Sequence, residues 1–304
     1  MFNFALPKKM KLIWVTAMYN FRQWKGNTRV IATFILAFIL CFLLTDKTVD
    51  FAVTHETTMQ LVEAFVWTFG DSNSILLSSL LLLLLFADMP FITPATPFFL
   101  CRGSRKTWVF GQMVYILLAT AGYLLFILMS TCLLCMRLSF TKNTWSRTAA
   151  ILAYSDEGKR IALPAAVKTL EMSRPYEAMA YIFLLLLLYT LVMVFIMLLF
   201  NLWRGQLAGV ISVLIFSVYG LLLNPENIQK LLKLPEALYY KARVWVGWVS
   251  PLNHATYSMH NFGYDQLPTL RQTGLLFGTL LAALVLLTIR AMRRYGFQFK
   301  GTEN

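Results

Sequence analysis

The chain has 304 residues, of which 58% are hydrophobic and 13% are charged, and its formal net charge is +13. Soluble domains carry about 25% charged residues, so this composition excludes an ordinary soluble protein. The positive charge does not point to a nucleic-acid partner, because basic residues also flank membrane helices on their cytoplasmic side.

An amphipathic helix is predicted at residues 6–29, ahead of the first apolar segment. Pro7 suits the start of a helix. At helical spacing, the apolar face consists of Met10, Trp14, Ala17, Met18 and Phe21. The polar face consists of Lys9, Thr16, Asn20 and Gln23. This pattern predicts a helix that lies on the cytoplasmic leaflet of a membrane.

Six apolar segments follow, covering about residues 30–45, 72–89, 108–136, 178–200, 206–223 and 272–289. A membrane-spanning helix needs roughly 20 apolar residues. The first segment is about 24 Å long at 1.5 Å per residue, so we expect that helix to extend a turn past its charged borders. The predicted fold is therefore an all-α polytopic membrane protein with six transmembrane helices in a single domain, residues 1–304.

The distribution of charge orients these six spans. Both termini and the two loops on their side hold 14 basic residues and two acidic ones, Asp88 and Glu303, whereas the other three loops hold 13 basic and 12 acidic residues. Short basic segments favour the cytoplasmic side. The sequence therefore predicts that both termini are cytoplasmic.

The segment 89–107 is predicted to be a cytoplasmic elbow between the second and third spans. Proline removes a helix hydrogen bond and restricts the residue before it, so the proline-rich start of this segment should break the chain where it leaves the membrane. We expect Asp88 to cap this break or to pair with Arg102 or Arg105. The residues assigned to the break are Asp88, Pro90 and Pro94.

The three predicted external loops differ in character. Residues 46–71 are acidic, residues 137–177 are polar with mixed charge, and residues 224–271 contain the aromatic stretch "VWVGWVSPLNHATYSMHNFGY". Because Trp and Tyr prefer the membrane interface, we expect the last loop to form interfacial or re-entrant short helices. The residues of this stretch for which the family resemblance given below implies a role as an external cap are Trp245, Trp248, Pro251 and Tyr257.

Sequence motifs for catalysis are absent. The chain has no GxxxxGK[ST] phosphate loop, no HExxH zinc motif and no GxSxG nucleophile elbow. Its three histidines, at positions 55, 254 and 260, all fall in predicted external loops, and His254 and His260 lack nearby acidic ligands. We therefore expect a chain that is not an enzyme and that holds no metal or cofactor of its own.

The stretch "FFLCRGSRKTWVFGQ" concentrates positive charge between two apolar spans. Arg102, Arg105 and Lys106 lie within five residues. A short basic elbow suits the docking of a soluble partner. Charge alone favours the other interpretation, in which these residues are the ordinary cytoplasmic flank of a membrane helix.

The order of these features resembles the permease subunits of type-2 ATP-binding-cassette exporters. The most suggestive pieces are "LCRGSRKTWVFGQ" after the second span and "WVSPLNHATY" before the sixth. The chain has no nucleotide-binding domain, so the resemblance is to members whose ATPase is a separate chain.

The resemblance implies two contacts with that ATPase and one linking element. The elbow would be the coupling helix, and the turn "NLWRGQ" would be a minor second contact. The coupling residues so implied are Pro97, Phe98, Phe99, Arg102, Gly103, Ser104, Arg105, Lys106, Trp108, Trp203 and Arg204. The residues implied for the N-terminal connecting helix are Lys9, Trp14, Phe21, Arg22 and Trp24.

The resemblance also implies the partners and the activity. Two permease chains, identical or different, would move an apolar or amphipathic substrate such as a lipid, drug or peptide by alternating access across a bacterial plasma membrane. ATP and magnesium would be bound by the partner ATPase. Membrane lipids are expected partners and nucleic acid is not. The alternative is a non-transporting membrane protein, such as an immunity factor, sensor or assembly partner, which binds through its external aromatic loop.

Overall fold

The computed structural model describes residues 7–155, 157–160, 165–233, 235 and 238–297, and it is almost entirely helical. In this part of the chain, four helices are long and apolar enough to cross a membrane: α2 (Thr28–Thr54), α6 (Arg105–Cys135), α10 (Pro175–Arg204) and α15 (Leu270–Arg294). The number rises to six if two bent helix pairs each count as one span. The chain is therefore an all-α protein with several long apolar helices, as expected for a membrane protein.

In each bent pair, only the longer helix coincides with a predicted span, the second or the fifth, and the shorter helix lies in a segment predicted to be a loop. Helix α3 (Glu63–Phe69) meets α4 (Ser72–Phe86) at 87°, and α11 (Gln206–Leu222) meets α12 (Pro225–Leu231) at 76°. Asp71 caps the start of α4 by accepting hydrogen bonds from the backbone N–H groups of Asn73 and Ser74. The break before α4 is therefore fixed by an ordinary helix cap.

The first long helix continues beyond the predicted span. Helix α2 runs to Thr54, so residues 46–54 are helical and do not belong to a loop. Asp46, Lys47 and Asp50 lie on its exposed face, while Phe51 and Ala52 are buried. At 27 residues the helix is about 40 Å long, which exceeds the roughly 30 Å hydrocarbon core. Its charged end can thus project beyond a bilayer.

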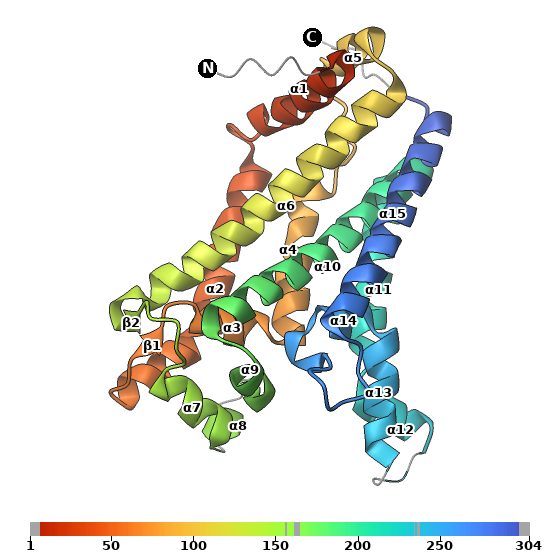
Figure 1. Ribbon diagram of the computed structural model, residues 1–304. Coiled ribbons are helices and arrows are strands. Elements are labelled where there is room, and N and C mark those ends of the chain that lie inside the picture. The colour runs from red at the N-terminus through yellow and green to blue at the C-terminus, as the bar shows by residue number, and fades with distance from the viewer. Residues whose placement is uncertain (1–6, 156, 161–164, 234, 236–237, 298–304) are drawn as a thin grey trace.

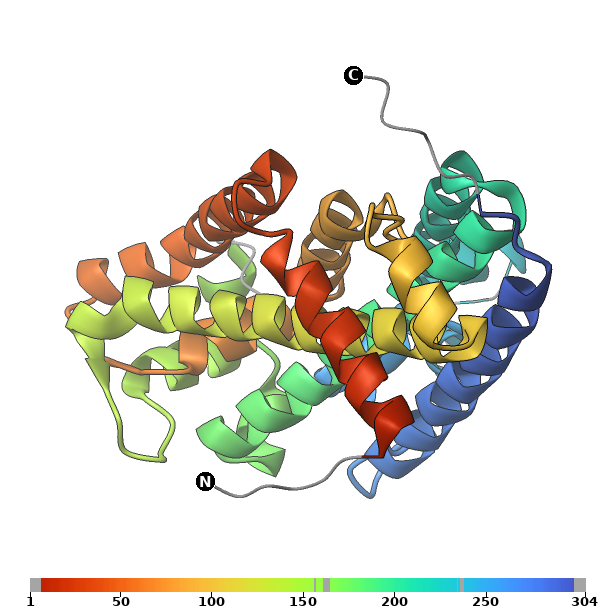
Figure 2. The same cartoon turned by 90° about the horizontal axis from the view of Figure 1, so that it is seen from above.

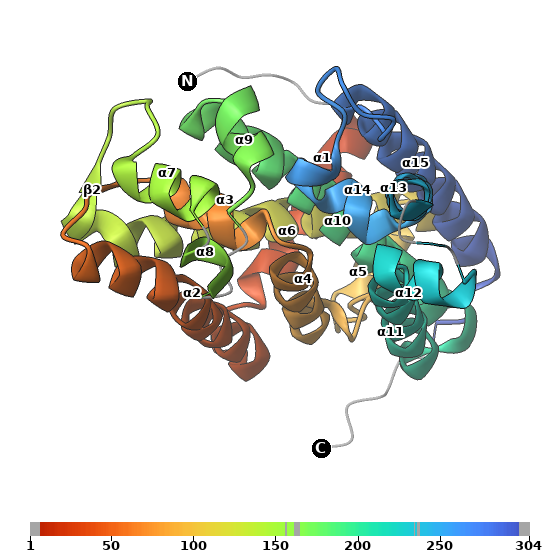
Figure 3. The same cartoon turned by 90° about the horizontal axis from the view of Figure 1, so that it is seen from below.

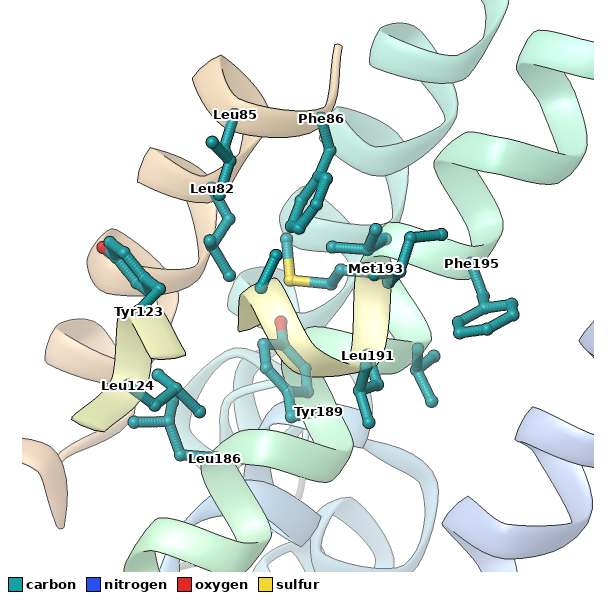
Figure 4. Close-up of a cluster of buried hydrophobic side chains, with 14 of the residues drawn as sticks. Leu82, Leu85, Phe86, Tyr123, Leu124, Leu186, Tyr189, Leu191, Met193 and Phe195 are labelled. Carbon is teal, nitrogen blue, oxygen red and sulfur yellow. The ribbon is translucent and has the colours of Figure 1, made fainter. Parts of the chain in front are cut away.

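Helix α10 forms the centre of the bundle. Its most apolar stretch is 72% buried, against 28% for α2 and α15. Figure 4 shows side chains of α10, among them Leu186 and Tyr189, packed with Leu82 and Phe86 of α4 and with Tyr123 of α6. A helix that is apolar on all sides is expected in such a central position.

The two loops after α2 and α6 fold together at one end of the bundle. Strand β1 (Met59–Gln60) pairs in parallel with β2 (Ser139–Phe140), which follows the short helix η1 (Met136–Leu138). Three short helices follow: α7 (Arg147–Tyr154), α8 (Glu157–Arg160) and α9 (Val167–Met172). Figure 3 shows them gathered beside α3. The described residues of the expected polar loop at 137–177 thus form short helices and one short strand, and residues 175–177 belong to α10.

The aromatic loop also consists of short helices, α12, α13 (Tyr239–Val249), α14 (Pro251–Ala255) and η3 (Tyr257–Met259). They lie at the same end as α7–α9 (Figure 1). The opposite end carries α1 (Lys8–Arg22), α5 (Thr96–Arg102) and the last turn of α15 (Figures 1 and 2). Residue 6 of the predicted first helix and Glu303 lie outside the described residues.

Candidate functional site

Helix α1 is docked on the first half of α6, which it crosses in Figure 2. The Nδ2 group of Asn20 donates a buried hydrogen bond of 2.9 Å to Oε1 of Gln112. The indole N–H of Trp24 donates to the hydroxyl of Tyr115 at 2.7 Å. Gly111 lets the two helices approach, because a Cβ at this position would lie 2.6 Å from Cβ of Thr16.

The buried side of α1 does not coincide with either predicted face. Thr16 and Asn20 of the polar face are buried together with Ala17 of the apolar face, whereas Lys9 and Gln23 of the polar face are exposed. Met10 and Trp14 of the apolar face are each 50% exposed. The reason is that Gln112 on α6 satisfies the polar group of Asn20, which makes its burial acceptable. The exposed apolar side chains remain available to a lipid surface.

The other residues assigned to the connecting helix divide between the two faces. Lys9 and Arg22 are exposed. Phe21 is half-buried, with its ring centroid 4.9 Å from that of Tyr115 and 5.1 Å from that of Trp24. Phe21 and Trp24 therefore anchor the end of α1 to α6, whereas the basic side chains face outward.

Asp88 pairs with Arg29, at the start of α2, and not with either arginine of the elbow. The expected pairing with Arg102 or Arg105 is therefore wrong. Arg29 lies in the first turn of α2, which the fold brings next to the end of α4. Pro90, which follows a cis peptide bond, is buried, and Pro94 is exposed.

Asn201 fixes the chain where it leaves α4, a role that was not predicted. Its Nδ2 group donates to the backbone carbonyls of Ala87 at 3.1 Å and Met89 at 2.7 Å. These carbonyls have lost their helical partners because α4 ends here. A single asparagine that follows a long apolar run near the end of this 30-residue helix was the available sequence signal.

Helix α5 forms the elbow, with Pro97 in its first turn. Phe99 packs edge-on against Tyr19 of α1, with centroids 5.6 Å apart. Gly103 lies under Leu12 of α1, where an added Cβ would meet Cδ2 at 2.3 Å. Phe98 is 70% exposed. The elbow is thus held against α1 while one large aromatic side chain projects outward.

The basic cluster divides into an outward-facing part and an inward-tied part. Arg105 donates to the backbone carbonyls of Arg293 at 3.4 Å and Tyr295 at 3.1 Å. Its guanidinium also lies 5.5 Å from the ring centre of Phe297. Arg105 therefore holds the segment after α15, which the sequence did not predict.

Trp108 and Ser104 are structural members of the predicted coupling set. Trp108 is 2% exposed, and its ring centroid lies 5.4 Å from that of Phe297. Ser104 caps α6 by accepting from the backbone N–H of Thr107 at 3.2 Å. Phe98, Arg102 and Lys106 are exposed, and so are Ser104 and Arg105 despite their hydrogen bonds.

The turn between α10 and α11 exposes a second aromatic and basic pair. Trp203 is 67% exposed, and Arg204 beside it is also exposed. Gly205 has a φ of +92°, a conformation that favours glycine. The turn faces the loop after α4 across a cavity lined by residues of both segments.

The predicted external cap is partly core and partly surface. Trp245 and Trp248 are 50% and 44% exposed. The indole N–H of Trp248 donates to the carbonyl of Gln266 at 2.9 Å. Pro251 is buried, and Tyr257 is buried with its ring stacked on Tyr181 at 6.0 Å.

His254 and His260 are both buried, although both were expected in an external loop. His254 Nδ1 and His260 Nε2 each lie 2.9 Å from the hydroxyl of Thr273, in the first turn of α15. His254 Nε2 lies 3.0 Å from the carbonyl of Trp248, and His260 Nδ1 lies 3.1 Å from two carbonyls. Each of these outer nitrogens must therefore donate.

Counting hydrogens shows that the cluster is one proton short when both rings are neutral. The hydroxyl of Thr273 can donate to only one of the two imidazole nitrogens that face it. An unpaired buried acceptor costs about 1–3 kcal/mol. A buried charge without a partner costs several kcal/mol. Both rings therefore stay neutral at pH 7, and one of the two imidazole nitrogens that face Thr273 receives no hydrogen bond from its hydroxyl. The cluster joins α14 and the segment after η3 to α15.

This cluster makes the stability of the fold depend on pH. Burial lowers the pKa of His254, and burial lowers the pKa of His260 to about 4, with a smaller effect from Lys168. The unfolded chain, whose histidines titrate near 6.5, therefore takes up protons first as the pH falls. We expect stability to be highest above about pH 6.5 and to decline toward pH 4, and His260→Gln should reduce that decline.

The measurement is the apparent melting temperature of the detergent-solubilised protein between pH 7.5 and 4.5. The matched control is His55→Gln, since His55 is exposed. If the melting temperature falls equally with pH in the wild-type protein and in both variants, the buried histidine cluster is not the source of the pH dependence.

Comparison of the chain with protein-family models, with curated proteins and with solved structures found no match. Among the described residues, no group of three His, Cys, Asp or Glu side chains could hold a metal ion.

Proposed function

We propose that this chain is the membrane-spanning permease subunit of an ATP-driven exporter of the type-2 ATP-binding-cassette class. The observation that carries the proposal is the elbow α5. It projects Phe98, which is 70% exposed, beside Arg102 and Lys106, while Phe99 and Gly103 hold it against α1. A projecting aromatic side chain next to exposed basic groups, on a well-held helix, suits a docking site on a soluble protein.

The elbow is placed to pass motion into the bundle. It leads directly into α6, whose start is capped by Ser104. Helix α6 is continuous over 31 residues and is about 46 Å long. Its inner face packs against α1, which is itself hydrogen-bonded to α6. A partner that pushes on α5 would therefore move α1 and α6 together.

In this proposal the partner hydrolyses ATP with magnesium, and this chain carries out no covalent chemistry. The nucleotide state of the partner would shift the balance between two arrangements of the helices. Two permease chains, identical or different, would form the pathway with six spans each. A substrate that is apolar or amphipathic fits the apolar exposed faces of α2 and α11.

The proposed setting is a bacterial plasma membrane, with both termini cytoplasmic. The segments at the end that carries α1, α5 and the end of α15 have an excess of basic over acidic residues, whereas the two numbers are nearly equal in the other loops, and this supports a cytoplasmic position for that end. The tryptophans of the aromatic loop, at the opposite end, would then lie at the outer interface.

The elbow is tested by the double variant Phe98→Glu with Arg102→Glu. Arg105 is left unchanged because it holds the segment after α15. We expect normal insertion and yield, but at least a tenfold loss of co-purifying ATPase activity, since the change removes an apolar anchor and reverses a charge. The measurement is ATPase activity and partner content after affinity purification from membranes.

The matched control is Tyr240→Glu with Lys241→Glu, an exposed aromatic residue and an exposed lysine on α13 at the opposite end. The control should retain the wild-type amount of partner. Full retention of the partner by the elbow variant would refute the docking role of α5.

A further inference from the structure

A cavity of about 520 Å³ opens at the end of the molecule that carries α1 and α5. Three connecting segments surround it: the turn between α1 and α2, the loop after α4, and the turn between α10 and α11. Its volume is within the range of pockets that hold small ligands. Because Asn201 fixes the loop after α4, one wall of the cavity is held in place without a ligand.

The cavity has an apolar side that leads to the surface of the bundle. Val30, Leu85 and Ile92 line it, together with Leu84, which is 43% exposed on α4. In a membrane, such an exposed leucine on an apolar helix faces lipid. A hydrocarbon chain attached to a bound polar group could therefore leave the cavity along Leu84.

A hydrogen-bond donor without a protein acceptor lies on the opposite wall. The hydroxyl of Tyr115 accepts from the indole N–H of Trp24, so its own hydrogen points elsewhere. No acceptor for that hydrogen is present in the described part of the chain. Tyr115 is 1% exposed and lines the cavity. A ligand that offers an oxygen atom would supply the missing acceptor.

Opposite charges lie side by side at the cavity wall. Arg29 and Asp88 form an ion pair there, with side chains that are 58% and 42% exposed. An ion pair between exposed side chains contributes little to stability, so either partner can be exchanged for a charged group of a ligand. A guanidinium matches a phosphate and a carboxylate matches an amine, so the pair is complementary to a zwitterion.

We propose that this cavity binds the zwitterionic phosphate–amine group of an amphiphile. The phosphate pairs with Arg29, the amine pairs with Asp88, and an ester or hydroxyl oxygen accepts from Tyr115. The hydrocarbon chain follows Leu84 out to the membrane. This assignment does not depend on a transport role, because it needs only a chain embedded in a membrane.

Native mass spectrometry of the detergent-solubilised full-length protein tests the assignment with three probes. Lysophosphatidylethanolamine carries the zwitterion and a chain, lysophosphatidylglycerol carries a net negative charge, and glycerophosphoethanolamine carries the zwitterion alone. We expect one tightly bound lysophosphatidylethanolamine and at least tenfold weaker binding of lysophosphatidylglycerol. If glycerophosphoethanolamine also binds, the site recognises the head group alone and its ligand can be a free phosphate–amine compound. If it does not bind, the hydrocarbon chain is needed and the ligand is a lipid.

Two variants separate charge recognition from damage to the fold. Asp88→Asn should weaken the binding of lysophosphatidylethanolamine at least tenfold. It should strengthen the binding of lysophosphatidylglycerol, because Arg29 is then unpaired. Arg29→Gln should weaken both lipids. Asp265→Asn, which removes the acidic partner of Lys168 in an ion pair elsewhere in the molecule, is the matched control and should bind as the wild type does.

Wild-type protein that binds neither lipid, or binds both equally, would overturn the proposal. So would an unchanged preference in Asp88→Asn, since a purely structural ion pair would not set the charge selectivity of a ligand. A Tyr115→Phe variant adds an independent check. It removes only the hydroxyl and should weaken lysophosphatidylethanolamine several-fold.

Discussion

Replacing Gly111 with alanine is expected to detach α1 from α6 and to destabilise the protein by about 1–3 kcal/mol, as overpacking of a buried contact does. A Cβ at this position would lie 2.6 Å from Cβ and 2.8 Å from Cγ2 of Thr16, and 3.0 Å from the carbonyl oxygen of Ile13. A backbone atom and a β-branched side chain cannot move aside without shifting the helix. Asn20 and Gln112 would then lose their buried hydrogen bond.

The same helix offers a matched control in Gly122, which has no atom within 4 Å of a built Cβ. Alanine is favoured over glycine in a helix by up to about 1 kcal/mol, so Gly122→Ala should be neutral or stabilising. The apparent melting temperature and the rate of proteolysis within α1 would be measured for both variants. Equal behaviour of the two would show that α1 is not held by the close contact at Gly111.

Replacing Glu63 with alanine is expected to destabilise the end of the bundle that carries α3 and α7 by about 1–3 kcal/mol, the usual cost of leaving a buried hydrogen-bonding group without its partner. Glu63 is fully buried in α3. Its carboxylate accepts from the backbone N–H of Ser146 at 2.7 Å and from the Ser146 hydroxyl at 2.6 Å. Loss of the carboxylate leaves a buried backbone donor without an acceptor.

Limited proteolysis and thermal stability would measure this change. Cleavage should increase within residues 139–154, because Ser146 also caps α7 by accepting from the backbone N–H of Ala149 at 3.0 Å. Glu63→Gln keeps one acceptor oxygen and should have a smaller effect. If Glu63→Ala were as stable as the wild type, the contact with Ser146 could not be what holds the loops after α2 and α6 together.

Hydrophobic runs predicted the long helices well because local composition decides them. Residues 178–200 and 108–136 fall almost entirely inside α10 and α6. The runs could not show that α2 continues through Asp46 and Lys47. Those charges are tolerated because that turn of α2 keeps one face exposed beside a buried one. The short helices and strand within 137–177 depend on pairing between distant segments, which no local pattern encodes.

The outward-facing part of the elbow was predictable, but its internal ties were not. A proline-bounded basic segment between two apolar runs marked Phe98 and Arg102 as surface candidates, and both are exposed. Arg105 binds carbonyls about 190 positions later in the chain, so sequence proximity to Arg102 was misleading. For the same reason Asp88 pairs with Arg29 and not with its neighbours in the elbow.

Polar side chains that are buried with a specific partner were the features that the sequence predicted least well. Thr16 and Asn20 were placed on a polar surface because helical periodicity separates polar from apolar residues without showing which face has a partner. Glu63 and the histidines at positions 254 and 260 fall in segments between the predicted spans, and the sequence pattern there did not indicate that they would be buried. Each of them is buried because a specific partner satisfies it.

The proposed permease function is tested most directly by purifying the tagged wild-type chain from its native membranes in mild detergent and assaying the eluate for a partner ATPase. The account predicts a soluble ATPase in about equal molar amount, with ATP hydrolysis that is lost in the Phe98→Glu, Arg102→Glu variant. A chain that purifies alone, without ATPase activity in several detergents, would contradict it. The basic residues of the elbow would then serve only to orient the helices in the membrane. The exposed Trp245 and Trp248 would become the better candidate for a binding surface.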